Sequence, residues 1–144
     1  MKGSIIIIRN NEQVVTADYA DYKDIQKAVG DLAEHFLTMD FDSEKGETFQ
    51  IIGFCNEEYL LIDSEETNIV NAGAFLLNEQ IVYGNIAFLI DKGNGEERGF
   101  TKAEEKKFVN TVTALIKSNA GVVSMVHNRY DGNKPDPRVT FISF

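Results

Sequence analysis

Five consecutive apolar residues, 86–90, constrain the fold more than any other feature of this sequence. The run (I-A-F-L-I) does not alternate with polar residues, so both faces of the extended chain would be apolar. Such a segment is typical of a strand in the middle of a sheet that is covered on both sides. The residues before it, about 66–77, predict a short helix or a wide turn. We therefore expect a sheet built around residues 86–90.

Further strands are predicted elsewhere along the chain. Residues 4–9 are largely β-branched, and a polar turn at Asn10-Asn11 separates them from the extended segment 13–17, so the two predict a hairpin. Four more strands are expected at residues 48–55 and 58–62, which would form a second hairpin, and at 122–126 and 139–144. Polar loops are expected at residues 38–47, 91–98 and 127–138.

Two helices are predicted from the 3.6-residue spacing of apolar side chains. Residues 21–37 carry one apolar stripe, and Asp21 can cap the first turn. Residues 101–118 begin with the capping box Thr101-x-x-Glu104. Together these elements indicate an α+β fold in one domain, residues 1–144. It would contain a mixed or antiparallel sheet of about five to seven strands, with both helices packed mainly on one face.

The charge of the chain is negative and unevenly distributed. Lys and Arg total 14 against 23 Asp and Glu, and residues 1–100 alone carry 19 acidic and 7 basic side chains, a net charge of −12. Direct binding to nucleic acid is disfavoured, because affinity for phosphates comes from Lys and Arg. The charge either keeps the protein in solution or selects a basic partner. We expect the partner to contact Asp40, Asp42, Glu44, Glu57, Glu58, Glu65, Glu66, Glu96 and Glu97.

Basic, aromatic and imidazole side chains gather in one predicted loop, residues 127–138. Its Arg and Lys groups could hold a phosphate or nucleotide, and its tyrosine could stack on a base. The loop could equally be a solvated segment whose Arg residues pair with the acidic body. Under the ligand hypothesis, the binding residues are His127, Arg129, Tyr130, Lys134 and Arg138, with Asn68, Asn71 and Asn85 as polar anchors.

The sequence offers no catalytic or metal-binding motif. Cys55 ends an apolar strand, which is typical of a small buried hydrophobic residue rather than a nucleophile. His35 has no second histidine at helical spacing, so we expect no metal there. Residues 91–98 lack the Gly-Lys-Ser/Thr ending of a phosphate loop. We expect no enzymatic activity, no cofactor and no metal, and the single cysteine predicts a reducing, cytoplasmic location.

Several short motifs lie along residues 4–110. They are the opening apolar strand, Ile25-Gln26-Lys27-Ala28-Val29-Gly30, Asn56-Glu57-Glu58, Asn68, Gly84-Asn85, and a Gly-Glu turn before Thr101-x-x-Glu104. These motifs resemble the family catalogued as domain of unknown function 3846, small proteins of phages, plasmids and integrated elements. The family has a basic residue after the asparagine matched to Asn68, whereas Ile69 stands there in this chain. The resemblance implies a mobile-element origin and no established activity.

These observations predict a non-enzymatic interaction protein. Its expected role is that of a phage or mobile-element inhibitor of a host defence system, with an acidic surface that binds a host protein and in one version mimics DNA. The partner would be a defence protein or a nucleic-acid-binding protein. The alternative is a protein that sequesters a nucleotide or another small molecule with residues 127–138. No membrane contact is expected, and pairing of strand 139–144 with a second copy would give a homodimer.

Overall fold

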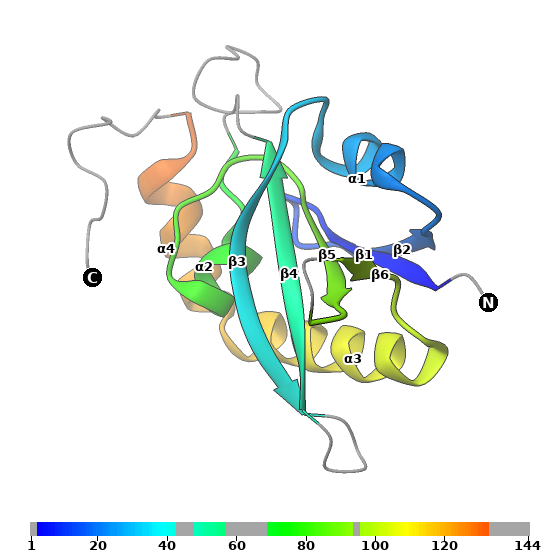
Figure 1. The fold of residues 1–144 in the computed structure, drawn as a ribbon. Coiled ribbons are helices and arrows are strands. Elements are labelled where there is room, and N and C mark those ends of the chain that lie inside the picture. The colour runs from blue at the N-terminus through cyan, green and yellow to red at the C-terminus, as the bar shows by residue number, and fades with distance from the viewer. Residues whose placement is uncertain (1–2, 43–47, 57–68, 94–95, 133–144) are drawn as a thin grey trace.

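The computed structural model describes residues 3–42, 48–56, 69–93 and 96–132. Within these ranges the chain forms one antiparallel sheet and four helices (Figure 1). The strands are β1 (Ser4–Ile8), β2 (Val14–Asp18), β3 (Ala33–Asp42), β4 (Thr48–Asn56), β5 (Ile86–Asp91) and β6 (Glu97–Arg98). The helices are α1 (Tyr22–Val29), α2 (Ala72–Asn78), α3 (Lys102–Ser118) and α4 (Ala120–Tyr130).

Strand β5 lies at the centre of the sheet, as the sequence predicts. The strand order is β2-β1-β5-β4-β3, and the short β6 pairs with the end of β5 that β1 does not reach. Every residue from Ile86 to Ile90 is buried. Both faces of β5 are covered, which explains why its apolar residues do not alternate with polar ones.

The two faces of the sheet have separate apolar clusters. One cluster joins Ile6, Phe88 and Ile90 to Phe108 and Val112 of α3, and the neighbouring helices α2 and α4 lie on this same side. The other cluster joins Ile5, Ala87 and Leu89 to Ile25 of α1. The α+β class and the antiparallel sheet are therefore confirmed, and most of the helical mass covers one face. Helix α1 is the exception, because it covers the opposite face (Figure 1).

The first predicted helix is shorter than its apolar stripe suggested. It ends at Val29 because Gly30, with φ of 127°, caps it and turns the chain away. The residues that continued the stripe then enter strand β3, where Leu37 is buried against the α3 side of the sheet. Leu32, expected in the same stripe, is 47% exposed. Pairing with β4 along its whole length holds this segment as a strand, which outweighs its helical periodicity.

The predicted polar loop at 38–47 is also corrected in its first half. Thr38, Asp40 and Asp42 are exposed and alternate with the more buried Met39 and Phe41, so this segment is the second half of β3. The period of two was visible in the sequence, but the density of charged residues concealed it. Residues 43–47 lie outside the described ranges.

The predicted strand at residues 122–126 is a helix. Helix α4 buries Val126 and Tyr130 against Val70, Ala72 and Tyr83, and Val122 packs at the margin of this cluster. The i, i+4, i+8 spacing of Val122, Val126 and Tyr130 suits a helix, and this tertiary packing overrides the β propensity of valine. His127, Arg129 and Tyr130 therefore lie on a helix and not in a loop.

The other predicted elements divide as follows. The hairpin of β1 and β2, the short helix α2 and the helix α3 with its capping box are confirmed. Strand β4 is confirmed, but its partners are β3 and β5. The turn expected at residues 91–98 contains the short strand β6. The strands expected at 58–62 and 139–144 lie outside the described residues.

Candidate functional site

Three carboxylates form a row across the end of the sheet. Asp40 of β3 is the pairing partner of Gln50, Gln50 is the partner of Asp91, and Asp91 is the partner of Glu97. Residues paired across neighbouring strands point to the same face. With strands about 4.8 Å apart, Asp40 and Asp91 are separated by roughly 10 Å, with the Gln50 amide between them. We call Asp40, Asp91 and Glu97 the acidic row.

The acidic row points to the same side of the sheet as α1. The neighbouring residues Phe41, Ile51 and Ile90 belong to the cluster on the α3 side, so the alternate positions face the other way. Asp40 is exposed, whereas Asp91 and Glu97 are half-buried. On this side, the row continues the sheet surface beyond the part that α1 covers.

The first turn of α1 adds negative charge close to the row. Asp21 and Asp24 form a capping box at the start of this helix, in which each carboxylate accepts backbone N–H bonds. Partial burial raises the pKa of Tyr19, and the charges of Glu97, Asp21 and Asp24 raise it further. These three carboxylates from β6 and α1 therefore act on a single phenol.

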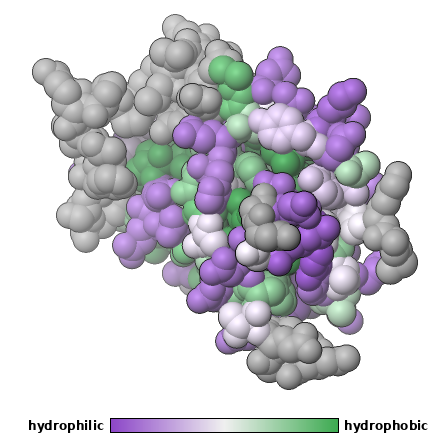
Figure 2. All heavy atoms as spheres, viewed as in Figure 1, coloured by the Kyte–Doolittle hydropathy of each residue, from purple (hydrophilic) through white to green (hydrophobic). Residues whose placement is uncertain are grey.

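Several basic side chains near the row are already engaged. Arg98 pairs with Ile90, faces the α3 side and donates two hydrogen bonds to Glu104. Lys107 donates to the backbone carbonyl of Asp42 and lies over the Phe41 ring. Lys92 and Glu96 form an exposed ion pair at 3.9 Å. These three cations therefore contact groups other than Asp40, Asp91 and Glu97. Hydrophilic side chains cover much of the surface visible in Figure 2.

The structure brings together only part of the predicted acidic contact. Asp40 and Glu97 belong to the row, Asp42 follows Asp40 on the same face of β3, and exposed Glu96 precedes Glu97. Asp91 was missed, because it ends the apolar strand and reads as the first residue of a turn. The remaining predicted residues, Glu44, Glu57, Glu58, Glu65 and Glu66, lie outside the described ranges.

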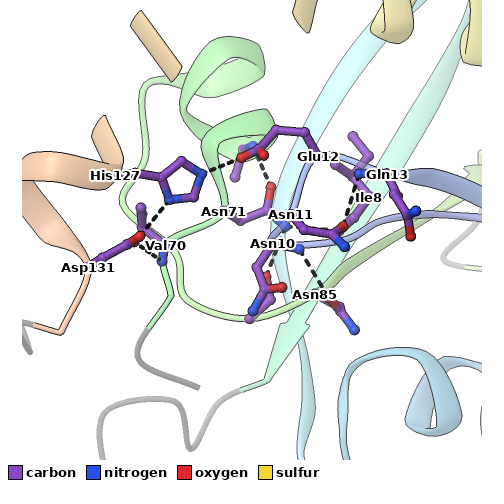
Figure 3. Close-up of polar contacts among 12 residues, drawn as sticks. Ile8, Asn10, Asn11, Glu12, Gln13, Val70, Asn71, Asn85, His127 and Asp131 are labelled. Atoms are coloured by element: carbon purple, nitrogen blue, oxygen red, sulfur yellow. Dashed lines mark hydrogen bonds and ion pairs between the residues drawn. The ribbon is translucent and has the colours of Figure 1, made fainter. Parts of the chain in front are cut away.

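A second polar cluster surrounds His127 on α4 (Figure 3). Its Nδ1 lies 2.8 Å from Oδ2 of Asp131, and its Nε2 contacts Oε1 of Glu12 in the turn between β1 and β2. The other carboxylate oxygen of Asp131 accepts the backbone N–H of Val70 at 2.9 Å. We call His127, Glu12 and Asp131 the histidine cluster.

The geometry of the histidine cluster fits a doubly protonated imidazole. Partial burial lowers the pKa of His127, but the hydrogen bonds and charges of Glu12 and Asp131 outweigh it, so the net shift is upward. Both ring nitrogens then donate to carboxylates. In this arrangement neither nitrogen is available as a general base or a metal ligand. The histidine joins two parts of the chain.

The predicted ligand residues do not converge on one site. Asn71 is fully buried, and its side chain caps α2 through Ala74 N–H and donates to the carbonyls of Ile8 and Gly84. Asn85 accepts the backbone N–H of Asn10. Tyr130, the last residue of α4, is 6% exposed. Arg129 is exposed, with its guanidinium 5.9 Å from the Tyr130 ring. Asn68, Lys134 and Arg138 lie outside the described residues.

Sequence reasoning missed Glu12 and Asp131, the two partners of His127. Glu12 has a φ of 70°, a left-handed conformation that glycine or asparagine adopts more readily than glutamate. The Asn10-Asn11 turn signal was recognised, but the long-range contact was not, because α4 was read as a strand. On a helix, His127 and Asp131 are i, i+4 neighbours, which was the available signal.

Neither a metal-binding cluster nor a membrane-spanning helix is found in the described ranges. No group of three or more His, Cys, Asp or Glu side chains there is arranged to hold a metal ion. His35 is exposed, and its Nε2 lies 2.8 Å from the Leu37 carbonyl and from the Thr38 hydroxyl. No helix in those ranges is long and apolar enough to cross a membrane. Comparison with protein-family models, curated proteins and solved structures found no match to this chain.

Proposed function

We propose that this protein is a non-enzymatic interaction protein that presents an acidic sheet face to a basic surface of a partner protein. The observation that carries this proposal is the acidic row, in which carboxylates from three strands share one face. Like charges at this spacing repel one another, and a partner that brings Lys or Arg side chains relieves that repulsion. One member of the row, Glu97, acts on the Tyr19 phenol together with Asp21 and Asp24, which adds two carboxylates near that end of the row.

The partner class follows from the charge. A surface that accepts regularly spaced carboxylates is typical of proteins that bind nucleic acid, since they carry Lys and Arg for phosphates. We infer that the partner is a nucleic-acid-binding or defence protein of a bacterial host, and that the contact takes place in the host cytoplasm. The resemblance of residues 4–110 to small phage and mobile-element proteins favours the role of a defence inhibitor.

The test compares two variants of matched charge. One replaces the row (Asp40→Asn, Asp91→Asn, Glu97→Gln), and the other replaces three acidic residues outside it (Glu34→Gln, Glu79→Gln, Glu105→Gln). Affinity capture from lysate of a bacterial host should recover the same basic protein with the wild type and the control, and at least tenfold less with the row variant. Both variants lose three charges, so a difference between them reports position and not net charge.

Two further measurements define the mode of binding. Raising the salt concentration should weaken the complex, because exposed charges are screened over about 10 Å at 0.1 M salt. Duplex DNA should compete if the row occupies the nucleic-acid site of the partner. Equal recovery of the partner by both variants, or no protection of phage in plaque assays on a defended host, would contradict the proposal.

A further inference from the structure

Helix α4 packs against the rest of the protein along one side, through Val122, Val123, Val126 and Tyr130. At its start, Asn119 alone separates it from α3, and no side chain caps its first turn. A Cβ atom added to Gly121, in that first turn, would meet nothing within 4 Å. That side of the first turn is open, and Asn119, with φ of −122° and ψ of 34°, is the single residue between α3 and α4 and is placed to act as a hinge between two rigid helices.

The C-terminal end of α4 is fastened by three polar contacts. His127 reaches Glu12 in the β1–β2 turn, Asp131 accepts the Val70 N–H, and the Tyr83 hydroxyl donates to the Tyr130 carbonyl at 3.0 Å. Beneath these contacts, Val126 and Tyr130 cover the apolar cluster of Val70, Ala72 and Tyr83. Release of this end would expose that cluster.

We propose that α4 is an arm hinged at Asn119 and held closed by protonated His127, so that loss of one proton loosens the arm from the sheet. A neutral imidazole has one N–H and one lone pair. In the closed position its two nitrogens face two carboxylates, so the neutral ring leaves one carboxylate opposite a lone pair. One charge-assisted hydrogen bond then becomes a repulsive contact.

The charged surroundings of His127 make the direction of this switch definite. Glu12 faces it from the β1–β2 turn and Asp131 from the end of α4, and both favour the charged ring. Arg129 of α4 is exposed. Helix α2 has no acidic residue in its first turn and no basic residue in its last turn. On the side of α3, Lys117 lies exposed in the last turn.

The sign of the pH dependence follows. The pKa of His127 in the folded protein is raised above its ordinary value of 6.5. The contribution of the histidine cluster is therefore complete below about pH 6.5 and is lost as the pH rises through the raised pKa. The arm is closed below about pH 6.5 and loosens as the pH rises through the raised pKa of His127.

Hydrogen exchange tests the proposal. Protection factors, which correct for the intrinsic effect of pH on exchange, are measured for Val70 and for the amides of α4 at pH 6 and pH 9. In the wild type, the protection factors of Val70 and α4 should fall between pH 6 and pH 9 by on the order of tenfold more than the protection factors of β5. This is the loss expected for one charge-assisted hydrogen bond. His127→Gln should show low protection at both pH values, and His35→Gln should behave as the wild type.

A measurement on the unmodified protein covers the case in which His127→Gln does not fold. The two histidines of the chain are followed by NMR from pH 5 to 9.5. The ring of His127 should titrate above pH 6.5, together with the amide shift of Val70, and Glu12→Gln should move that titration to lower pH. Protection of α4 that does not change between pH 6 and 9, or a Val70 shift that does not follow His127, would overturn the proposal.

Discussion

Arg98 donates two hydrogen bonds to the carboxylate of Glu104, at 2.8 and 2.9 Å, and thereby joins β6 to the first turn of α3. Glu104 also accepts the Thr101 N–H at 2.8 Å as part of the capping box. The bonds from Arg98, followed by those of Thr101, lower the pKa of Glu104 to about 2 despite its partial burial. The Glu104 side chain thus caps α3 and at the same time forms the ion pair with Arg98 of β6.

Replacement of this carboxylate should destabilise the protein in a pH-dependent way. Because the folded-state pKa of Glu104 is depressed, its stabilisation is complete above about pH 4.5 and is lost as the pH falls towards 2. After allowance for solvent screening, Glu104→Gln should lower the free energy of unfolding by about 1–2 kcal/mol at pH 7. Urea denaturation at pH 7 and pH 3 measures this, with Glu105→Gln as control. A penalty that is equal at both pH values would contradict the assignment.

Asn71 should be among the most sensitive positions to substitution. Its buried amide makes three hydrogen bonds, one as the cap of α2 and two to the carbonyls of Ile8 and Gly84. Asn71→Ala leaves these groups without partners and should cost roughly 2–4 kcal/mol in urea denaturation. Asn71→Asp should cost at least as much, because a carboxylate would face two carbonyls. Asn85→Ala, at a half-buried site, is the control and should cost less than about 1 kcal/mol.

Two glycine-to-alanine changes should have opposite effects. A Cβ on Gly99 would lie 2.6 Å from the backbone of Gly3, where no flexible side chain can move aside. Gly99→Ala should therefore destabilise the protein by about 2 kcal/mol or more. Gly121 lies in α4 with open space around it, so Gly121→Ala should stabilise by roughly 0.5–1 kcal/mol. Thermal unfolding compares the two, and a destabilising Gly121→Ala would show that α4 needs a flexible first turn.

Gln50 offers a way to separate stability from partner binding. It lies between Asp40 and Asp91 in the pairing order and donates to Asp40 at 3.4 Å. Gln50→Lys places a cation between two carboxylates and should stabilise the fold by about 0.2–1 kcal/mol at low salt. The same change should weaken binding of a basic partner. The stabilisation should vanish in 1 M salt, where the screening length is about 3 Å; a gain that persists there would have a different origin.

The elements that sequence reasoning located correctly are those whose local and tertiary preferences agree. Residues 86–90 can be satisfied only in a buried strand, and the Thr101–Glu104 capping box specifies a helix start with its own hydrogen bonds. The errors occurred where tertiary contacts decided between two patterns. Residues 33–37 fit a helical stripe but pair with β4 as a strand. Residues 122–126 have β propensity but form part of helix α4, which packs on the third apolar cluster.

The candidate site was less predictable than the fold for a related reason. The acidic row depends on the register of three strand pairs, which no local pattern encodes. The histidine cluster joins Glu12 to His127 across most of the chain, and it appears only when α4 is recognised as a helix. Asn71 was predicted as a polar anchor for a ligand, whereas in the structure its side chain holds the backbone.

The central position of β5 also dictates the order in which the sheet can assemble. The β1–β2 and β3–β4 pairs are hairpins of neighbouring segments and close short loops, whereas β5 pairs Ile7 with Ala87 and Ile51 with Ile90. Contacts between such distant residues form slowly, because a long loop must close before they contribute. We therefore expect the β1–β2 and β3–β4 pairs to form before β5 pairs with either of them. The last expected step of sheet assembly is the insertion of β5 between the two hairpins.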